Sequence, residues 1–219
     1  MQWLATSGVI AVSLCSNPVS AEWKTLTVEG ITVTSRAQPG SAMREVWATA
    51  TLRAPIEDIQ SVLLDIESHA SFMPHVVESK HLGIAEPGNA CLAYTRLEFP
   101  LLSSRDFILR ITVDKRVTAE GGDEFVSHWV SEPGALPERS GVIRLRLNEG
   151  SWRARRISAS ETGVAYRFHV DPAGWIPPML ANEANRRVLP SVFRSLEAEV
   201  QSRETKRRAR QAETVLTAK

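Results

Sequence analysis

The side chains that most often carry chemistry are few in this chain, and their spacing does not predict a catalytic or metal-binding set. The five histidines stand at positions 69, 75, 81, 128 and 169. His75 and His81 are too far apart to hold one metal ion from a single strand, and no nearby aspartate or cysteine completes a ligand set. The sequence contains no Ser-His-Asp arrangement, phosphate-binding glycine loop or Cys-x-x-Cys motif. It therefore favours a binding protein over an enzyme and predicts neither cofactor nor metal, although acid and base groups can still converge from different strands.

Charged residues beside apolar runs allow two interpretations. Arg105 and Asp106 are adjacent, so in a strand their side chains point to opposite faces and each needs its own partner. Arg105 can bind the headgroup of a ligand, or both residues can be structural hydrogen-bonding groups. Buried charges generally persist only when they are paired, which favours the structural interpretation. The same two interpretations apply to Arg144.

Composition limits the classes of protein. The 219 residues suffice for one domain with a substantial core, or for two very small ones. Hydrophobic residues make up 43%, charged residues 23%, and the net charge is +1, as in an ordinary globular protein. There is no basic excess to predict nucleic-acid binding, and no run of about 18 apolar residues to predict a membrane span.

The N-terminus resembles an export signal. The first 21 residues have no charged side chain, residues 3–14 are mostly apolar, and Val19-Ser20-Ala21 offers small residues to a signal peptidase. We expect residues 1–21 to be a signal peptide and the mature protein to be periplasmic or secreted, with a short anchor or an apolar arm as the alternative. After such cleavage Cys91 is the remaining cysteine, expected as a small core residue in a chain without an internal disulfide.

The pattern of elements is rich in strands. Residues 25–28 and 31–34 form a hairpin signal around Glu29-Gly30, and Pro55 opens a helix with apolar residues at three- and four-residue spacing. Further strands are expected over residues 44–52, 75–84, 90–98, 106–115, 124–130, 141–148, 151–157 and 163–170. Short links between them predict antiparallel neighbours in one curved sheet, which makes an α+β fold.

The chain ends in a strand that leads into one long helix. Tyr166, Phe168 and Val170 alternate with polar residues before a tight turn, and prolines 177 and 178 suit a first helical turn. Pro190 is expected to kink the helix, and the basic residues 202–219 are expected to be a disordered or frayed tail. A helix that closes over a concave sheet predicts a cavity.

Several motifs resemble those of START domains, the lipid-transfer domains related to the steroidogenic acute regulatory protein. The sequences SRDFI at residues 104–108, PERSGVIR at 137–144 and the stretch 166–182 occur in the order found in that family. Asp65 and Phe72-Met73-Pro74 also resemble it. The resemblance covers residues 22–200, so a START-like lipid-binding domain is expected over 22–201.

The resemblance implies a helix-grip fold, in which an antiparallel sheet wraps around the terminal helix and one hydrophobic molecule lies between them. It implies binding and transfer of a lipid or sterol-like ligand between membranes by a monomer that touches the membrane surface transiently. Two alternatives stay open. The wider SRPBCC superfamily includes polyketide cyclases and aromatases, which are enzymes built on the same cavity, and the domain can also serve as a ligand-sensing module.

Alternation on the strands and the apolar start of the helix give the expected ligand contacts. They are Leu92, Tyr94, Phe107, Leu109, Ile111, Phe125, Trp129, Arg144, Tyr166, Phe168, Trp175, Ile176, Met179 and Leu180. The alternative is that the strand residues form a solid core. The last four form an apolar lip, expected either to pack the helix start against the sheet or to gate lipid entry. Leu92 and Ile111 occupy the approximate positions of an acidic–basic pair in some sterol-carrying relatives, which argues against a sterol-type headgroup site.

Overall fold

The computed structural model describes residues 24–85, 90–118 and 121–217, so the predicted signal peptide lies outside the described residues. A ten-stranded sheet, three short helical segments and one long helix make up this part of the chain. The first elements are β1 (Lys24–Val28), β2 (Ile31–Ala37), β3 (Arg44–Leu52), α1 (Ile56–Leu64), η1 (Ile66–Ser68) and α2 (His69–Phe72). The remaining elements are β4 (Val76–Ala85), β5 (Ala90–Leu97), β6 (Ser104–Lys115), β7 (Glu124–Ser131), β8 (Val142–Arg144), β9 (Asn148–Arg156), β10 (Thr162–Val170) and α3 (Pro178–Thr217).

The strands follow the order β1-β2-β3-β10-β9-β7-β6-β5-β4, so the last strand lies in the middle of the sheet beside β3. All neighbours along this path are antiparallel, as expected from the short links. The expectation of strands at 141–148 and 151–157 is wrong in detail. The structure has the short β8, which pairs with β6 in parallel, and a β9 that already begins at Asn148.

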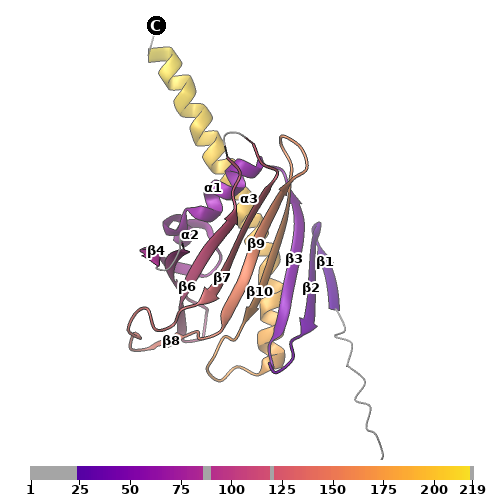
Figure 1. Ribbon diagram of the computed structural model, residues 1–219, viewed down its shortest axis with the longest axis vertical. Coiled ribbons are helices and arrows are strands. Elements are labelled where there is room, and N and C mark those ends of the chain that lie inside the picture. The colour runs from indigo at the N-terminus through magenta and orange to yellow at the C-terminus, as the bar shows by residue number, and fades with distance from the viewer. Residues whose placement is uncertain (1–23, 86–89, 119–120, 218–219) are drawn as a thin grey trace, which may run out of the picture.

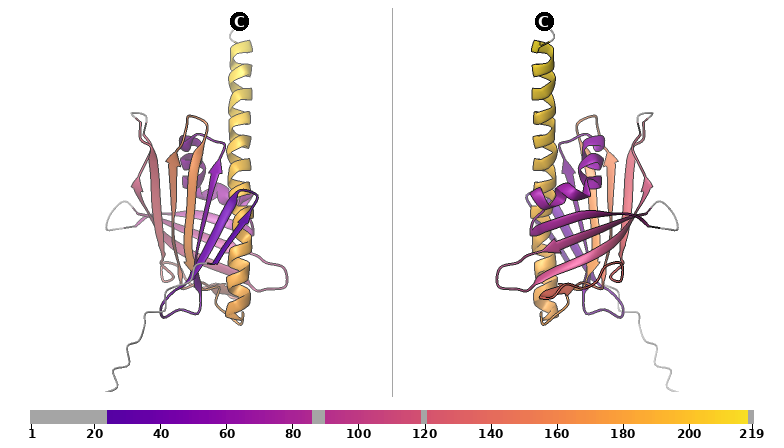
Figure 2. Two further views of the ribbon diagram at one scale, coloured as in Figure 1. Left: turned by 90° about the vertical axis from the view of Figure 1, so that its right-hand side faces the viewer. Right: turned by 90° about the vertical axis from the view of Figure 1, so that its left-hand side faces the viewer.

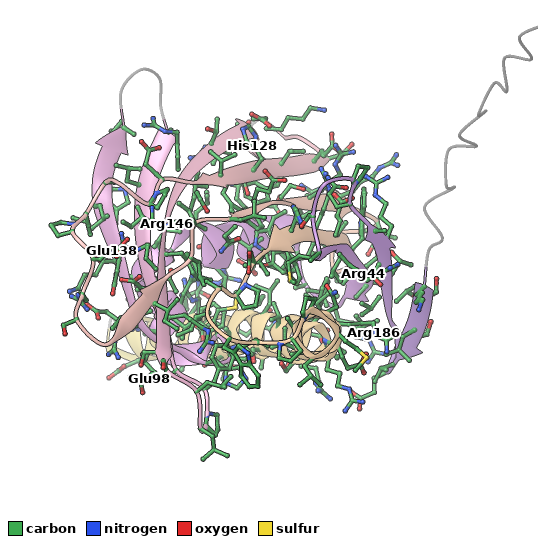
Figure 3. All side chains as sticks on the ribbon, turned by 90° about the horizontal axis from the view of Figure 1, so that it is seen from below. Arg44, Glu98, His128, Glu138, Arg146 and Arg186 are labelled. Carbon is green, nitrogen blue, oxygen red and sulfur yellow. The ribbon has the colours of Figure 1, made fainter. Side chains whose placement is uncertain are left out.

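The sheet curves around α3, as the view along the helix shows (Figure 3), and α3 packs against α1, α2, β2 and β3. Fully buried residues of α3, namely Leu189, Phe193 and Leu196, meet the core on the inner face of the sheet. This arrangement is the expected helix-grip fold. Helix α3 packs on β2 and β3, so a ligand could contact the inner face of the other strands.

Helix α3 runs without interruption through Pro190 and on through the basic segment as far as Thr217 (Figures 1 and 2). The expectation of a disordered or frayed tail is therefore wrong for the described residues. Ion pairs hold the first turns of this extension against α1 and the turn after it, because Arg203 Nη2 lies 2.8 Å from Asp65 Oδ2 and Arg207 Nη1 lies 2.9 Å from Asp58 Oδ1.

Candidate functional site

Five aromatic side chains gather between the sheet and α3. Tyr166 of β10 stacks on Trp152 of β9 with ring centroids 4.0 Å apart, and on Trp129 of β7 at 5.6 Å. Phe168 lies 5.4 Å from Tyr166, and Phe193 of α3 meets the edge of Trp152 at 5.9 Å. This aromatic cluster, made of Trp129, Trp152, Tyr166, Phe168 and Phe193, connects the helix to the middle of the sheet.

Strand register explains the cluster. Trp152 is paired with Tyr166, and Trp129 with Gly150, and directly paired residues share one face of a sheet. Because glycine has no side chain, the Trp129 ring lies directly over position 150. The Trp129 Nε1–H group donates a hydrogen bond of 3.1 Å to Asn148 Oδ1, which satisfies the one polar atom of this buried indole.

The inner face is not completely filled by protein. Phe107, Ile111, Trp152 and Tyr166 all pack against the buried core, yet each keeps part of its surface accessible. These side chains therefore present accessible apolar surface on the concave side of the sheet. A concave, mostly apolar surface is the usual setting of a small-molecule site.

Tyr166 adds a polar group to this space. Burial raises the pKa of its phenol well above the usual value, so the hydroxyl stays protonated at neutral pH. Among the described residues, the hydroxyl has no hydrogen-bond partner, and it is not among the side-chain atoms that are completely buried without one. It is therefore a neutral donor and acceptor that keeps some accessible surface on the inner face.

Seven of the expected ligand contacts lie on the inner face. They are Phe107, Leu109, Ile111, Phe125, Trp129, Tyr166 and Phe168. Four of them, Leu109, Phe125, Trp129 and Phe168, are buried in the core, whereas Phe107, Ile111 and Tyr166 remain partly accessible. The structure thus agrees in part with both alternatives, a solid core and a ligand-contacting surface: some of these residues form the core and others keep accessible surface.

The structure corrects the placement of Leu92 and Tyr94. Leu92 is paired with Arg110 and Tyr94 with Ile108, and these residues alternate with the inward-facing Leu109, so both lie on the outer face. The Tyr94 ring is covered by Arg139, whose guanidinium carbon is 5.0 Å from the ring centroid. The comparison of Leu92 and Ile111 with a polar pair inside the cavity fails, since Leu92 points away from it.

Arg144 is the second correction. Its guanidinium forms two hydrogen bonds with the Asp106 carboxylate, at 2.7 and 3.0 Å, and also donates to the backbone oxygens of Pro133, Leu136 and Pro137. Both side chains of the ion pair are almost completely buried on the outer face of β6. The structural interpretation is therefore confirmed for Asp106 and holds for Arg144, which is not free to bind a ligand.

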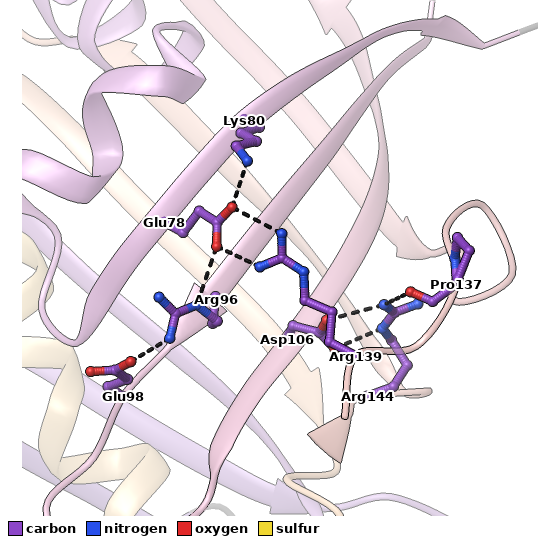
Figure 4. Close-up of polar contacts among 8 residues, drawn as sticks. All are labelled: Glu78, Lys80, Arg96, Glu98, Asp106, Pro137, Arg139 and Arg144. Atoms are coloured by element: carbon purple, nitrogen blue, oxygen red, sulfur yellow. Dashed lines mark hydrogen bonds and ion pairs between the residues drawn. The ribbon is translucent and has the colours of Figure 1, made fainter. Parts of the chain in front are cut away.

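A network of charges continues from this pair across the outer face of β4 and β5 (Figure 4). Glu78 accepts a 2.7 Å hydrogen bond from Arg139 and forms ion pairs with Lys80 and Arg96. These partners lower the pKa of the Glu78 carboxyl to about 2, with the Arg139 hydrogen bond as the largest cause. Together with the Asp106–Arg144 pair, the network fixes the segment between β7 and β9, residues 132–147, over the outside of the sheet.

The apolar lip is more exposed than a cavity lining. Trp175 is 94% exposed and Met179 78%, and Leu180 is also exposed, whereas Ile176 is half-buried. The first three therefore do not line the interior in this structure. They form an exposed apolar surface where α3 begins.

Trp152 and Phe193 are site residues that were absent from the expected contacts. Trp152 and Ala154 alternate with Arg153 and Arg155, which is a clear two-residue period. Phe193 belongs to the apolar stripe of the terminal helix. Both signals are present in the sequence.

Other features lie away from the inner face. An open depression of about 430 Å³ on the outer face is bordered mainly by threonines, glycines and the side chains of Arg153 and Arg155. His128 pairs with Asp114 at 2.9 Å on the exposed outer side. Within the described ranges, no group of histidine, cysteine or acidic residues could hold a metal ion, and no helix is long and apolar enough to cross a membrane.

A curved antiparallel sheet packed around a long terminal helix, with aromatic residues on its inner face, defines the helix-grip fold. A model of the family described as polyketide cyclase / dehydrase and lipid transport matches residues 52–197, and the chain belongs to this family.

Similar solved structures include lipid transfer proteins and an aromatase/cyclase. A STAR-related lipid transfer protein of Xanthomonas axonopodis is 27% identical, with a TM-score of 0.71 over 82% of this chain and 98% of that one. Human STARD10 is 16% identical, with a TM-score of 0.74 over 91% and 80%. The Zhui aromatase/cyclase of a Streptomyces species is 18% identical, with a TM-score of 0.53 over 74% and 95%, so the likeness to these last two concerns the fold.

Proposed function

We propose that this protein binds one hydrophobic molecule, a lipid or a sterol-like compound, beneath α3 and carries it between membranes. The observation that carries the proposal is the partly accessible aromatic and aliphatic surface on the inner face, above all Trp152, Tyr166 and Phe107. The free energy of the system falls when an apolar ligand replaces water beside exposed apolar side chains. The likeness to the Xanthomonas lipid transfer protein supports the same function.

The second candidate is an enzyme of the cyclase or aromatase kind, which the family description includes. Tyr166 is the group that would favour it, because its hydroxyl lies on the inner face without a hydrogen-bond partner among the described residues. A phenol whose pKa is raised by burial is a poor base, however, and no described acid or base side chain is hydrogen-bonded to it. This chemistry suits binding better than proton transfer.

The lip supplies a route for exchange with a membrane. Trp175, Met179 and Leu180 expose apolar surface at the start of α3, next to the segment that Arg105 contacts at Pro172. In this proposal they insert transiently into a membrane surface while the ligand passes, and the protein acts as a monomer in the periplasm or outside the cell. The predicted signal peptide supports the location, and fractionation of cells that express the full chain tests it.

Organic extraction of the purified protein followed by mass spectrometry tests the binding function. We expect one class of lipid in the extract, and uptake of lipid by stripped protein from vesicles of mixed phospholipids. The Trp152→Ala variant removes inner-face surface, and Trp47→Ala on the outer face of β3 is its matched control. Ligand retention without transfer between vesicles would favour the sensing module, whereas turnover of a polyketide substrate would favour the enzyme.

A further inference from the structure

Arg105 is a buried cation that has no counter-ion among the residues that the structure describes. The residue is 4% exposed, and its guanidinium donates from Nε to Pro172 O at 3.2 Å and from Nη1 to Ser103 O. No carboxylate of the described residues lies within ion-pair distance. Burial lowers the pKa of this guanidinium, but arginine remains protonated in proteins. The positive charge is therefore held in a poorly solvated place by two neutral carbonyl groups.

The other strongly buried acidic and arginine side chains are all paired. Arg144 and Asp106 neutralise one another, and Glu45 lies between Arg36 and Arg167. A buried charge without a partner costs several kcal/mol, so proteins rarely keep one that has no purpose. Arg105 is the exception within residues 24–85, 90–118 and 121–217.

The position of Arg105 relates it to the inner space. It alternates with Asp106 and shares the inner face of β6 with Phe107 and Leu109, which belong to or pack against the core. Its Nη2 group makes no hydrogen bond with a described residue. In the described residues, Tyr94 Oη is the one side-chain nitrogen or oxygen that is completely buried without a partner. Arg105 Nη2, which also has no partner there, must therefore retain some accessible surface.

The lip lies close by. Arg105 holds Pro172 in the segment that leads to Trp175 and α3, and a side-chain carbon at position 174 would be 3.9 Å from Arg105 Nη2. The cation therefore lies at the end of the inner space where the lip begins. An amphipathic ligand that entered there tail first would leave its headgroup beside Arg105.

We propose that Arg105 binds the anionic headgroup of the ligand, a carboxylate or a phosphate, while the apolar chain extends along the inner face past Phe107 toward Tyr166. This proposal rests on the proposed function and narrows its ligand to anionic amphiphiles. A guanidinium with free N–H groups forms charge-assisted hydrogen bonds with either group. The anion supplies the counter-charge that the described residues do not provide.

Competition against a neutral fluorescent reporter, the methyl ester of cis-parinaric acid, tests the proposal. Two pairs of competitors share the same acyl chain and differ in whether the headgroup is anionic: oleate against methyl oleate, and oleoyl lysophosphatidic acid against monooleoylglycerol. We expect the protein to prefer the anion in at least one pair by about tenfold or more. The pair that shows the preference identifies carboxylate or phosphate as the headgroup.

Variants separate recognition from folding. Arg105→Met should remove the preference while the reporter still binds, Arg105→Lys should keep part of it, and Arg110→Met on the outer face of the same strand should leave it unchanged. If Arg105→Met no longer binds the reporter, the Arg105→Lys variant distinguishes the two roles. An anion preference in Arg105→Lys supports recognition, whereas its absence indicates that Arg105 is merely structural. Equal affinities within both pairs for the unaltered protein overturn this proposal alone. Failure of the reporter and all competitors to bind overturns the proposed function with it.

Discussion

The Trp129 ring lies so close to Gly150 that a Cβ atom at position 150 would be 2.4 Å from the Trp129 ring carbon Cζ2, and also 2.2 Å from the Arg167 backbone oxygen. The glycine thus allows the aromatic cluster to form. Because a real Cβ cannot approach so closely, backbone or ring would have to move.

Gly150→Ala should therefore lower the free energy of unfolding by about 1–3 kcal/mol, the usual cost of overpacking, and weaken ligand binding. Denaturant unfolding checks it, with Gly134→Ala as control because a Cβ there meets nothing within 4 Å. A Gly150→Ala variant as stable as the Gly134→Ala variant would contradict this packing.

Replacing Trp152 should affect ligand binding more than replacing an outer tryptophan. Trp152 borders the unfilled inner space and stacks on Tyr166, whereas Trp47 is exposed on the other side of the sheet. We expect Trp152→Ala to weaken binding of the fluorescent reporter by about tenfold or more, and Trp47→Ala to leave it unchanged. Equal affinities for both variants, measured on folded protein, would place the ligand elsewhere.

The Asp106–Arg144 pair should stabilise the fold without touching the ligand. Asp106→Asn leaves the Arg144 charge buried and unpaired, so we expect a loss of about 3–5 kcal/mol in the free energy of unfolding. Arg146→Gln, which removes the exposed pair with Glu138, should cost less than about 1 kcal/mol. Chemical denaturation measures both. An Asp106→Asn variant of normal stability that loses ligand binding would contradict this structural role and indicate that Arg144 contacts the ligand.

Glu78 should contribute to the loss of stability in acid. The pKa of its carboxyl is about 2 in the folded protein against 4.5 for the free group, so the folded state binds fewer protons between these values. Its stabilising contribution is complete above about pH 4.5 and disappears as the pH falls toward 2. Urea unfolding between pH 2 and 7 should show a shallower acid dependence for Glu78→Gln than for the unaltered chain. Identical slopes would exclude this contribution.

The lip should govern adsorption to vesicles. Trp175 and Met179 are exposed, so replacing both with serine should leave the free energy of unfolding nearly unchanged. Adsorption should fall by about tenfold or more, because burial of each side chain in the membrane contributes about 1.5–3 kcal/mol. Ile84→Ser, at another exposed apolar residue, serves as control. Vesicle co-sedimentation measures the effect, and equal adsorption of lip and control variants would refute a membrane role for the lip.

Alternation in the sequence was sufficient to predict the inner faces of β6, β7 and β10, because most of the large apolar residues of these strands fall on inward positions. It misplaced β5, whose inward residues are the small Cys91, Ala93 and Thr95 while the larger Leu92 and Tyr94 point outward. The cause is tertiary: residues 132–147 fold back over the outer face and bury Tyr94 and Ile108 there.

Two other features depend on contacts between distant segments. Residues 148–150 have the composition of a turn but form the start of β9, since Gly150 serves the close approach of Trp129. The sequence around Arg105 and Arg144 also does not show which charged groups lie near each of them in the fold. Both arginines stand in the family-like motifs, yet Arg144 has a buried carboxylate partner and Arg105 has no carboxylate partner among the described residues.

Native mass spectrometry of the protein, purified without detergent and then exposed to vesicles, tests the central claim most directly. We expect a mass increase that corresponds to one lipid per chain, which diminishes in Trp152→Ala and persists in Trp47→Ala. A protein that stays free of lipid under these conditions, or whose bound lipid is unaffected by Trp152→Ala and lost in Trp47→Ala, would contradict a ligand site beneath α3.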